Sequence, residues 1–310
     1  MKGKRVAVTG GAGFIGSNLA EELATSNSVI IIDDLSTGKK ENIANLLQRD
    51  NVKFIQGSIV DLKLLKESFR GIDFVFHLAA LPSVPRSIED PRATNEVNIT
   101  GTLNVLLAAR DNNVNKVVYT SSSSVYGDTP TLPKSEDMPP NPQSPYALTK
   151  MVGEYYCRIF HQIYNLPTIC LRYFNVYGPR QDPNSQYAAV IPRFIARVSQ
   201  GKPPVIYGDG NQTRDFTYIK DAIQANLIAA EDSATGIFNI GRGERISINN
   251  LAKTILNIMG KDLQPVYEPP LPGDVRHSLA DVSKARKIGY NPKYDLEAGL
   301  KQTIESVKSF

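Results

Sequence analysis

The fold is decided by residues 5–33, which read RVAVTGGAGFIGSNLAEELATSNSVIIID. A β-branched run precedes three evenly spaced glycines, Gly10, Gly13 and Gly16, and a second apolar run ends at Asp33. Glycines at this spacing allow a tight turn from strand to helix, where backbone N–H groups and the positive helix end can bind a pyrophosphate. The stretch therefore predicts the first strand, helix and second strand of a dinucleotide-binding sheet, with the helix starting at Ser17.

Asp33 follows the glycines at about the 20-residue distance typical of such sites. A carboxylate there accepts hydrogen bonds from an adenosine ribose and repels a 2′-phosphate, and no arginine follows it directly. A structural turn and an unrelated exposed aspartate would not explain why both features stand at strand ends. We therefore predict an NAD site rather than an NADP site.

Further short apolar runs alternate with helix-length segments, as is typical of a parallel sheet covered on both faces. The pattern predicts an α/β fold, a Rossmann-type doubly wound parallel sheet with a smaller C-terminal substrate-binding lobe. The expected NAD-binding domain covers 1–172 with a returning segment at about 215–241, and the lobe is mainly 173–310. Strands are expected at 5–9, 29–32, 52–55, 74–78, 116–121, 168–173 and 237–240.

The composition is that of an ordinary globular protein, with 310 residues, 41% hydrophobic and 21% charged. A net charge of +4 without a dense basic run argues against nucleic-acid binding. The chain shows no signal peptide and no apolar stretch of the ~18 residues that a membrane span needs, so we expect a cytoplasmic protein. Neither Cys157 and Cys170 nor the dispersed His77, His161 and His277 have metal-site spacing, so no metal is expected.

Tyr146 and Lys150 stand four residues apart in segment 146–164, where apolar residues recur at helical spacing. Ser144 is the expected N-cap and Pro145 the first helical residue. A nearby ammonium and the helix N-terminus favour the phenolate, so Tyr146 could serve as a general base. A surface lysine beside a core tyrosine is the alternative for this pair taken alone.

The serine-rich stretch TSSSSVYG, residues 120–127, lies at the end of the expected strand 116–121. The carboxyl ends of parallel strands are where open α/β sheets bind ligands. A serine in this stretch could donate a hydrogen bond to a substrate oxygen and relay its proton to Tyr146.

Taken together, these motifs resemble the extended short-chain dehydrogenase/reductase family over essentially the whole chain. Within it, the chain is most similar to nucleotide-sugar 4-epimerases, particularly those acting on UDP-N-acetylhexosamines. The resemblance implies NAD as cofactor, a UDP-sugar as substrate, and Ser122, Tyr146 and Lys150 as catalytic residues.

The resemblance also implies which residues contact the cofactor. Ser58 departs from the family, whose members usually carry an aspartate there beside the adenine. The implied contacts are Gly10, Gly13, Phe14, Ile15, Gly16, Asp33, Ser58, Ile59, Leu78, Ala79, Asn98, Tyr146, Lys150 and Tyr173.

For the UDP-sugar, the resemblance implies that Arg214 and Arg276 bind the diphosphate, whose oxygens match a planar guanidinium. Ser278 is small at a position where a bulky tyrosine in relatives excludes an N-acetyl group. The implied substrate contacts are Ser83, Ser122, Ser123, Ser124, Tyr146, Asn175, Ala189, Val190, Arg214, Asp274, Arg276 and Ser278, with Asp274 at the ribose and Ala189 and Val190 at the uracil.

The three serines at 122–124 also bear on the reaction. Related 4,6-dehydratases carry Thr-Asp-Glu there, and decarboxylases carry a glutamate at the last position, so elimination and decarboxylation are disfavoured. We expect 4-epimerisation of UDP-N-acetylglucosamine and UDP-N-acetylgalactosamine through a 4-keto sugar, with UDP-glucose and UDP-galactose as further candidates. The alternatives are a UDP-glucuronate 4-epimerase, another nucleotide-sugar oxidoreductase, and a non-catalytic NAD-binding regulator on the same fold.

Many extended family members pair helices corresponding to 146–164 and about 95–111 across a two-fold axis, so the resemblance implies a homodimer. Apolar residues such as Tyr155 and Phe160 could equally be buried within one chain, and the sequence leaves both options open.

Overall fold

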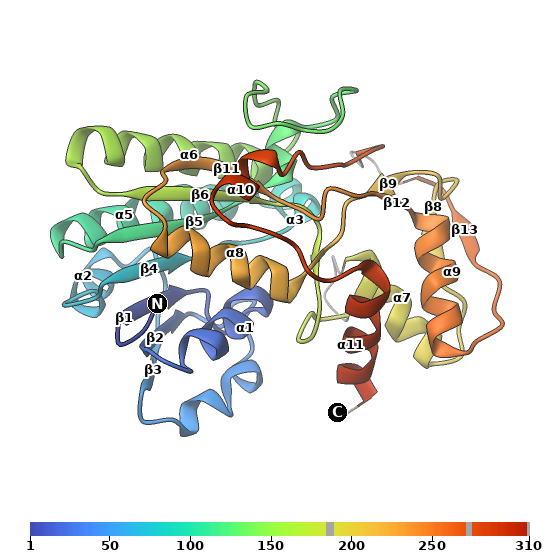
Figure 1. Ribbon diagram of the computed structural model, residues 1–310, viewed down its shortest axis with the longest axis horizontal. Coiled ribbons are helices and arrows are strands. Elements are labelled where there is room, and N and C mark those ends of the chain that lie inside the picture. The colour runs from blue at the N-terminus through green and yellow to red at the C-terminus, as the bar shows by residue number, and fades with distance from the viewer. Residues whose placement is uncertain (184–188, 271–274, 309–310) are drawn as a thin grey trace.

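The computed structural model describes residues 1–183, 189–270 and 275–308. A central sheet of seven parallel strands runs in the order β11-β6-β5-β4-β1-β2-β3 (Figure 1). This Rossmann-type α/β fold confirms the predicted class, and every predicted strand is present with bounds that differ by at most one residue. The strands are β1 Arg5–Thr9, β2 Ser28–Asp33, β3 Val52–Gln56, β4 Phe74–His77, β5 Lys116–Ser122, β6 Thr168–Tyr173 and β11 Gly236–Ile240.

Two hydrophobic cores cover the two faces of this sheet, and β1 shows how its side chains divide between them. Val6 and Val8 belong to the core that includes Leu19 of α1 (Phe14–Leu23) and Ala229 of α8 (Ile219–Glu231), whereas Ala7 faces the other core. This alternation follows from the two-residue period of a strand. The second core is built with helices α2 Leu62–Ser68, α5 Gly101–Asp111 and α6 Pro145–Tyr164.

The first helix starts at Phe14, three residues earlier than the predicted start at Ser17. Gly13 is its N-cap in an extended conformation, so Gly16 lies inside the first helical turn. A Cβ on Gly16 would stand 2.1 Å from the carbonyl oxygen of Gly10, which only a glycine avoids. The third glycine therefore serves close packing of the helix against the turn.

Helix α6 begins as predicted, because the Ser144 hydroxyl accepts a hydrogen bond from the Ala147 N–H at 3.1 Å and Pro145 is the first residue. Asn165, in the left-handed conformation with φ of 55°, ends it. The expected helix at about 95–111 consists of α4 Pro91–Asn95, a π-helical turn over Glu96–Thr100, and α5.

Much of the C-terminal part lies to one side of the sheet, at the right in Figure 1, but α8 packs against the sheet, β11 pairs with β6, and α10 lies beside β11. The division into two domains near residue 172 stays a prediction. No helix in the described ranges is long and apolar enough to cross a membrane. The remaining elements are α3 Val84–Glu89, α7 Val190–Ser199, α9 Ile248–Met259, α10 Ser283–Lys287, α11 Leu296–Lys308, β7 Val176–Tyr177, β8 Val205–Tyr207, β9 Thr213–Arg214, β10 Thr217–Tyr218, β12 Ile246–Ser247, β13 Val266–Glu268, and the short 3₁₀ turns Lys40–Ile43, Leu46–Gln48 and Ser123–Tyr126.

Candidate active site

A cavity of about 1600 Å³ opens at the carboxyl ends of the parallel strands and extends to the C-terminal part. Most of the predicted contacts line it, although they come from widely separated parts of the chain. They are Gly10, Gly13, Phe14, Ile15, Gly16, Asp33, Ile59, Leu78, Ala79, Ser83, Ser122, Ser123, Ser124, Tyr146, Lys150, Tyr173, Asn175, Ala189, Arg214 and Ser278. Ser58, Asn98, Val190 and Arg276 are not among the lining residues, and Asp274 lies outside the described residues.

One end of the cavity is shaped for a dinucleotide. Gly10 has a φ of +71°, and a Cβ there would lie 2.6 Å from the backbone nitrogen of Ala79, so the glycine turn keeps this wall open. The Asp33 carboxylate accepts hydrogen bonds from the N–H groups of Ala12 at 2.9 Å and Leu35 at 2.8 Å. Burial nonetheless raises its pKa, and its remaining lone pairs can accept ribose hydroxyls. The residues present fit NAD.

Asn98 and Ser58 do not line the cavity, but they hold loops next to it in place. The Asn98 amide binds both backbone groups of Leu81, at 2.8 and 3.2 Å, and donates to the Thr149 hydroxyl of α6 at 3.1 Å. Asn98 thus fixes the loop after β4 to α6. The Ser58 hydroxyl accepts a hydrogen bond from the Val60 N–H at 3.3 Å, which orders the turn after β3.

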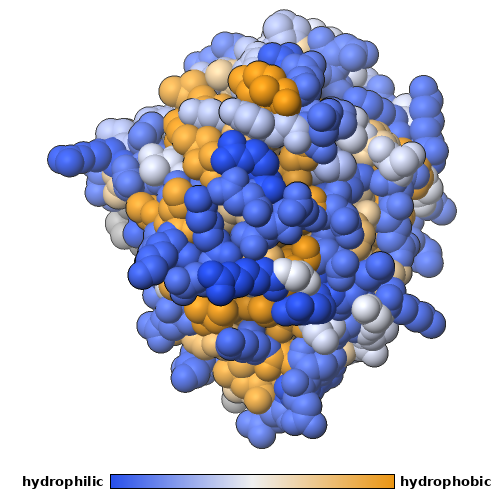
Figure 2. All heavy atoms as spheres, turned by 90° about the vertical axis from the view of Figure 1, so that its left-hand side faces the viewer, coloured by the Kyte–Doolittle hydropathy of each residue, from blue (hydrophilic) through white to orange (hydrophobic). Residues whose placement is uncertain are grey.

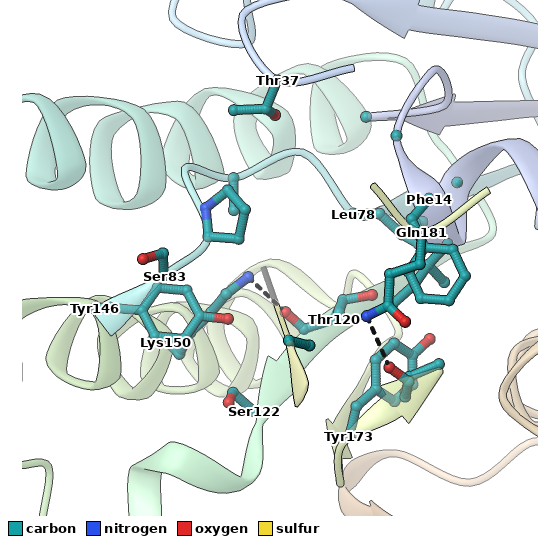
Figure 3. A pocket seen from close by; sticks show the side chains of 18 of the residues that line it. Phe14, Thr37, Leu78, Ser83, Thr120, Ser122, Tyr146, Lys150, Tyr173 and Gln181 are labelled. Carbon is teal, nitrogen blue, oxygen red and sulfur yellow. Dashed lines mark hydrogen bonds between the residues drawn. The ribbon is translucent and has the colours of Figure 1, made fainter. Parts of the chain in front are cut away.

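The predicted catalytic side chains meet at the middle of the cavity. Tyr146, Lys150, Ser122 and Ser83 lie close together in Figure 3, with Phe14 at a distance from them. Lys150 is 3% exposed, and its ammonium donates a hydrogen bond to the Thr120 carbonyl oxygen at 2.8 Å. Its nitrogen is 5.9 Å from the centre of the Tyr146 ring. The helical spacing therefore brings the pair together as predicted.

Burial dominates the electrostatics of this group. It lowers the pKa of Lys150 to about 8, while Glu154 and Cys157 act in the opposite direction. It also raises the pKa of Tyr146, which a hydrogen bond with Ser122 partly offsets. In the protein alone, burial therefore opposes the phenolate, and the role of Tyr146 as general base stays a prediction.

The other end of the cavity carries hydroxyl groups. Among the described residues, the buried Oγ atoms of Ser124 and Ser278 have no hydrogen-bond partner in the protein. Ser83 has a φ of +105°, which is unusual for a residue with a side chain and typical of strain held at functional sites. Unpaired buried hydroxyls cost free energy unless a ligand binds them, so this end is suited to a polyhydroxylated molecule.

The two predicted diphosphate ligands are placed differently. Arg214 lines the cavity and donates to the Thr213 carbonyl oxygen at 3.0 Å. Arg276 points to Asp209 instead, in a two-pronged ion pair with N–O distances of 2.9 and 2.8 Å, and both side chains are about half exposed. The structure therefore brings only Arg214 into the cavity.

Several cavity residues were not predicted, including Arg86, Lys134, Arg180, Gln181 and His277. All but Arg86, which lies on α3, stand in loops, where no periodic pattern marks the direction of a side chain. The buried Glu154, by contrast, follows Lys150 by four residues on α6, so helical spacing could have identified it.

Comparisons with known proteins agree with this geometry. Residues 6–241 match the family described as "NAD dependent epimerase/dehydratase family". The chain is similar to the solved structure of a UDP-N-acetylglucosamine 4-epimerase from Methanobrevibacter ruminantium M1 in complex with UDP-N-acetylmuramic acid, with 44% identity, a TM-score of 0.97, and 100% and 99% of the two chains covered.

Two further relatives carry other names. A UDP-glucose 4-epimerase of Mycolicibacterium smegmatis is 41% identical over 97% of both chains. The structure of a UDP-glucuronic acid 4-epimerase from Bacillus cereus, with its UDP-sugar and NAD, is 36% identical with a TM-score of 0.92, covering 98% and 99% of the chains. The glycine turn, the acid that follows it and these full-length matches lead to one conclusion: this chain belongs to the NAD-dependent epimerase/dehydratase family.

Proposed function

We propose that this protein is an NAD-dependent UDP-sugar 4-epimerase. The observation that carries the proposal is the meeting of Tyr146, Lys150 and Ser122 in one cavity with the glycine turn. Positions 122–124 offer three hydroxyls and no carboxylate, which supports return of the keto sugar to an alcohol over elimination.

This arrangement gives each of the three side chains a role in the reaction. NAD, when bound, would take the hydride from C4 of the sugar and give it back on the opposite face, and its positive charge would favour the phenolate. Tyr146 takes the proton of the 4-hydroxyl, the Ser122 hydroxyl donates a hydrogen bond to the same oxygen, and the Lys150 ammonium stabilises the phenolate. After the keto sugar turns its other face, Tyr146 returns the proton to the 4-oxygen.

We propose UDP-N-acetylglucosamine and UDP-N-acetylgalactosamine as the preferred substrates. Support comes from Ser278, a small residue that lines the cavity with an unpartnered hydroxyl, and leaves room for a 2-acetamido group. UDP-glucose and UDP-galactose are further candidates. An alternative function is 4-epimerisation of UDP-glucuronate, which the similarity to the Bacillus cereus enzyme favours.

The test is to incubate purified protein, without added NAD, with UDP-N-acetylglucosamine, UDP-glucose and UDP-glucuronate in parallel, and to separate the products. A 4-epimer without net formation of reduced nicotinamide is expected. A net change in the amount of reduced nicotinamide would favour another nucleotide-sugar oxidoreductase. Absence of any turnover would favour a non-catalytic NAD-binding regulator. A free 6-deoxy-4-keto sugar or a pentose product would overturn the proposal.

We also propose a homodimer that acts in the cytoplasm. Phe160 is buried within the chain, but α6 exposes a row of other large apolar side chains: Leu148, Tyr155, Ile159, Ile163 and Tyr164, each 39–65% exposed. The end of the molecule that carries α2, α5 and α6 shows hydrophobic groups among hydrophilic ones (Figure 2). Pairing of this helix face with a second copy would remove the apolar surface from water.

A further inference from the structure

One stripe of side chains along α6 is joined to the last three residues of β5, 120–122. The stripe consists of Tyr146, Lys150 and Glu154, which stand four residues apart and so share one helix face. Ser122 lies close to Tyr146 and lowers the pKa of its phenol, and the Lys150 ammonium donates a hydrogen bond to the carbonyl oxygen of Thr120 at 2.8 Å. The proposed mechanism uses these two connections, but not the third, which involves Glu154.

The third connection is a buried ion pair with a serine attached. The Ser121 hydroxyl donates to Glu154 Oε1 at 2.5 Å, and Arg172 of β6 donates to Oε1 and Oε2 at 2.8 and 2.7 Å. The side chains of Glu154 and Arg172 are only 3% and 2% exposed. A buried pair of this kind usually adds little stability over apolar side chains of equal volume, whereas it can fix the register of packed elements.

We propose that Glu154 is a positioning residue for the proposed epimerisation: through Ser121 it fixes the end of β5 against α6, and its negative charge stabilises the Lys150 ammonium. The inference rests on the proposed function. Ser121 lies between the residue that binds Lys150 and Ser122, so a shift there displaces both partners of the mechanism at once.

The charge of Glu154 matters because Lys150 is buried and has few other groups that stabilise its ammonium. Burial opposes the ammonium, and Glu154 is the largest influence that raises the pKa of Lys150. Buried His77 has its pKa lowered to about 3 and is neutral, so it adds no positive charge. The groups around Lys150 are His77 from β4, the Tyr119 ring from β5 at 5.2 Å, Tyr146, Glu154 and Cys157 from α6, and Arg172 from β6 behind Glu154.

The first variant is Ser121→Ala, which breaks the connection to β5 and leaves the ion pair intact. We expect kcat to fall roughly 10- to 100-fold, the usual effect of a small misplacement of catalytic groups, with KM for the UDP-sugar within about twofold. The alkaline limb of the pH profile should stay in place. Ser121→Thr keeps a hydroxyl and should restore most of kcat, and Ser68→Ala, which removes a buried serine from α2, is the matched control.

The second variant is the double substitution Glu154→Leu with Arg172→Met, since removing one partner alone would leave a buried charge. We expect the alkaline limb of kcat to move to lower pH, because Lys150 then loses its proton more readily. Bound NAD and the melting temperature are measured for every variant. The inference is overturned if both variants keep wild-type kcat and pH profile, or if activity falls only in step with folded, NAD-containing protein. A wild-type enzyme that epimerises no UDP-sugar would instead refute the proposed function.

Discussion

From the proposed substrate preference, we expect that replacing Ser278 with tyrosine lowers activity on N-acetylated UDP-sugars more than activity on UDP-glucose. Ser278 is 9% exposed, and its N–H donates to the Thr213 carbonyl oxygen at 3.0 Å, so its backbone is fixed beside the cavity. A phenol ring there must enter the space proposed for the acetamido group. Overpacking of a filled site costs about 1–3 kcal/mol, which corresponds to a roughly 5- to 150-fold loss of kcat/KM.

The assay compares kcat/KM for UDP-N-acetylglucosamine and UDP-glucose in Ser278→Tyr and the wild-type enzyme. UDP-glucose lacks the acetamido group, so its loss should be about tenfold smaller. Ser278→Ala serves as the control for size, because it removes the hydroxyl without adding volume, and any loss of kcat/KM should be similar for the two sugars. Equal losses on both sugars in the tyrosine variant would refute the steric argument.

Four other perturbations test the general base, the charge of Lys150, the cofactor turn and the proposed dimer interface. Tyr146→Phe should lower kcat about 10²- to 10⁴-fold without loss of bound NAD, as measured by initial rates; a smaller effect would remove Tyr146 from proton transfer. Activity should fall above about pH 8 as Lys150 loses its proton. Melting experiments should show no matching loss of stability. Because folding lowers the pKa of Lys150 from 10.5 to about 8, the contribution of Lys150 to the free energy of unfolding rises between pH 8 and pH 10.5. Gly10→Ala should abolish retention of NAD, assayed in the denatured protein, because its Cβ would stand 2.6 Å from the Ala79 nitrogen; normal NAD content would contradict the turn geometry. Ile163→Glu should yield monomers in light scattering, and an unchanged mass would exclude this helix face as the interface.

Sequence patterns predicted the sheet well because most of its strands are buried on both faces and read as nearly continuous apolar runs, although the edge strand β3 is only partly buried. The start of the first helix was placed at Ser17, since the pattern does not show that Gly16 already lies within the helix. Capping chemistry did locate the start of α6, where Ser144 and Pro145 stand in the predicted positions.

The site was predicted where family motifs and helical spacing agree, as for Tyr146 and Lys150. Spacing carries no information on solvation, so the rise in the pKa of Tyr146 could not be foreseen. Nor does it show tertiary pairing: Arg276 was expected in the cavity, yet the structure pairs it with Asp209, which is 67 residues away in the sequence.

Tyr146 and its neighbours are proposed to support epimerisation by removal and return of the hydrogen at C4. The most direct measurement is nuclear magnetic resonance of UDP-N-acetylglucosamine incubated with the purified enzyme in heavy water without added cofactor. We expect the 4-epimer, with C4 keeping its own hydrogen and no deuterium from the solvent. Deuterium at C4, or the absence of any 4-epimer from each UDP-sugar tested, would contradict it.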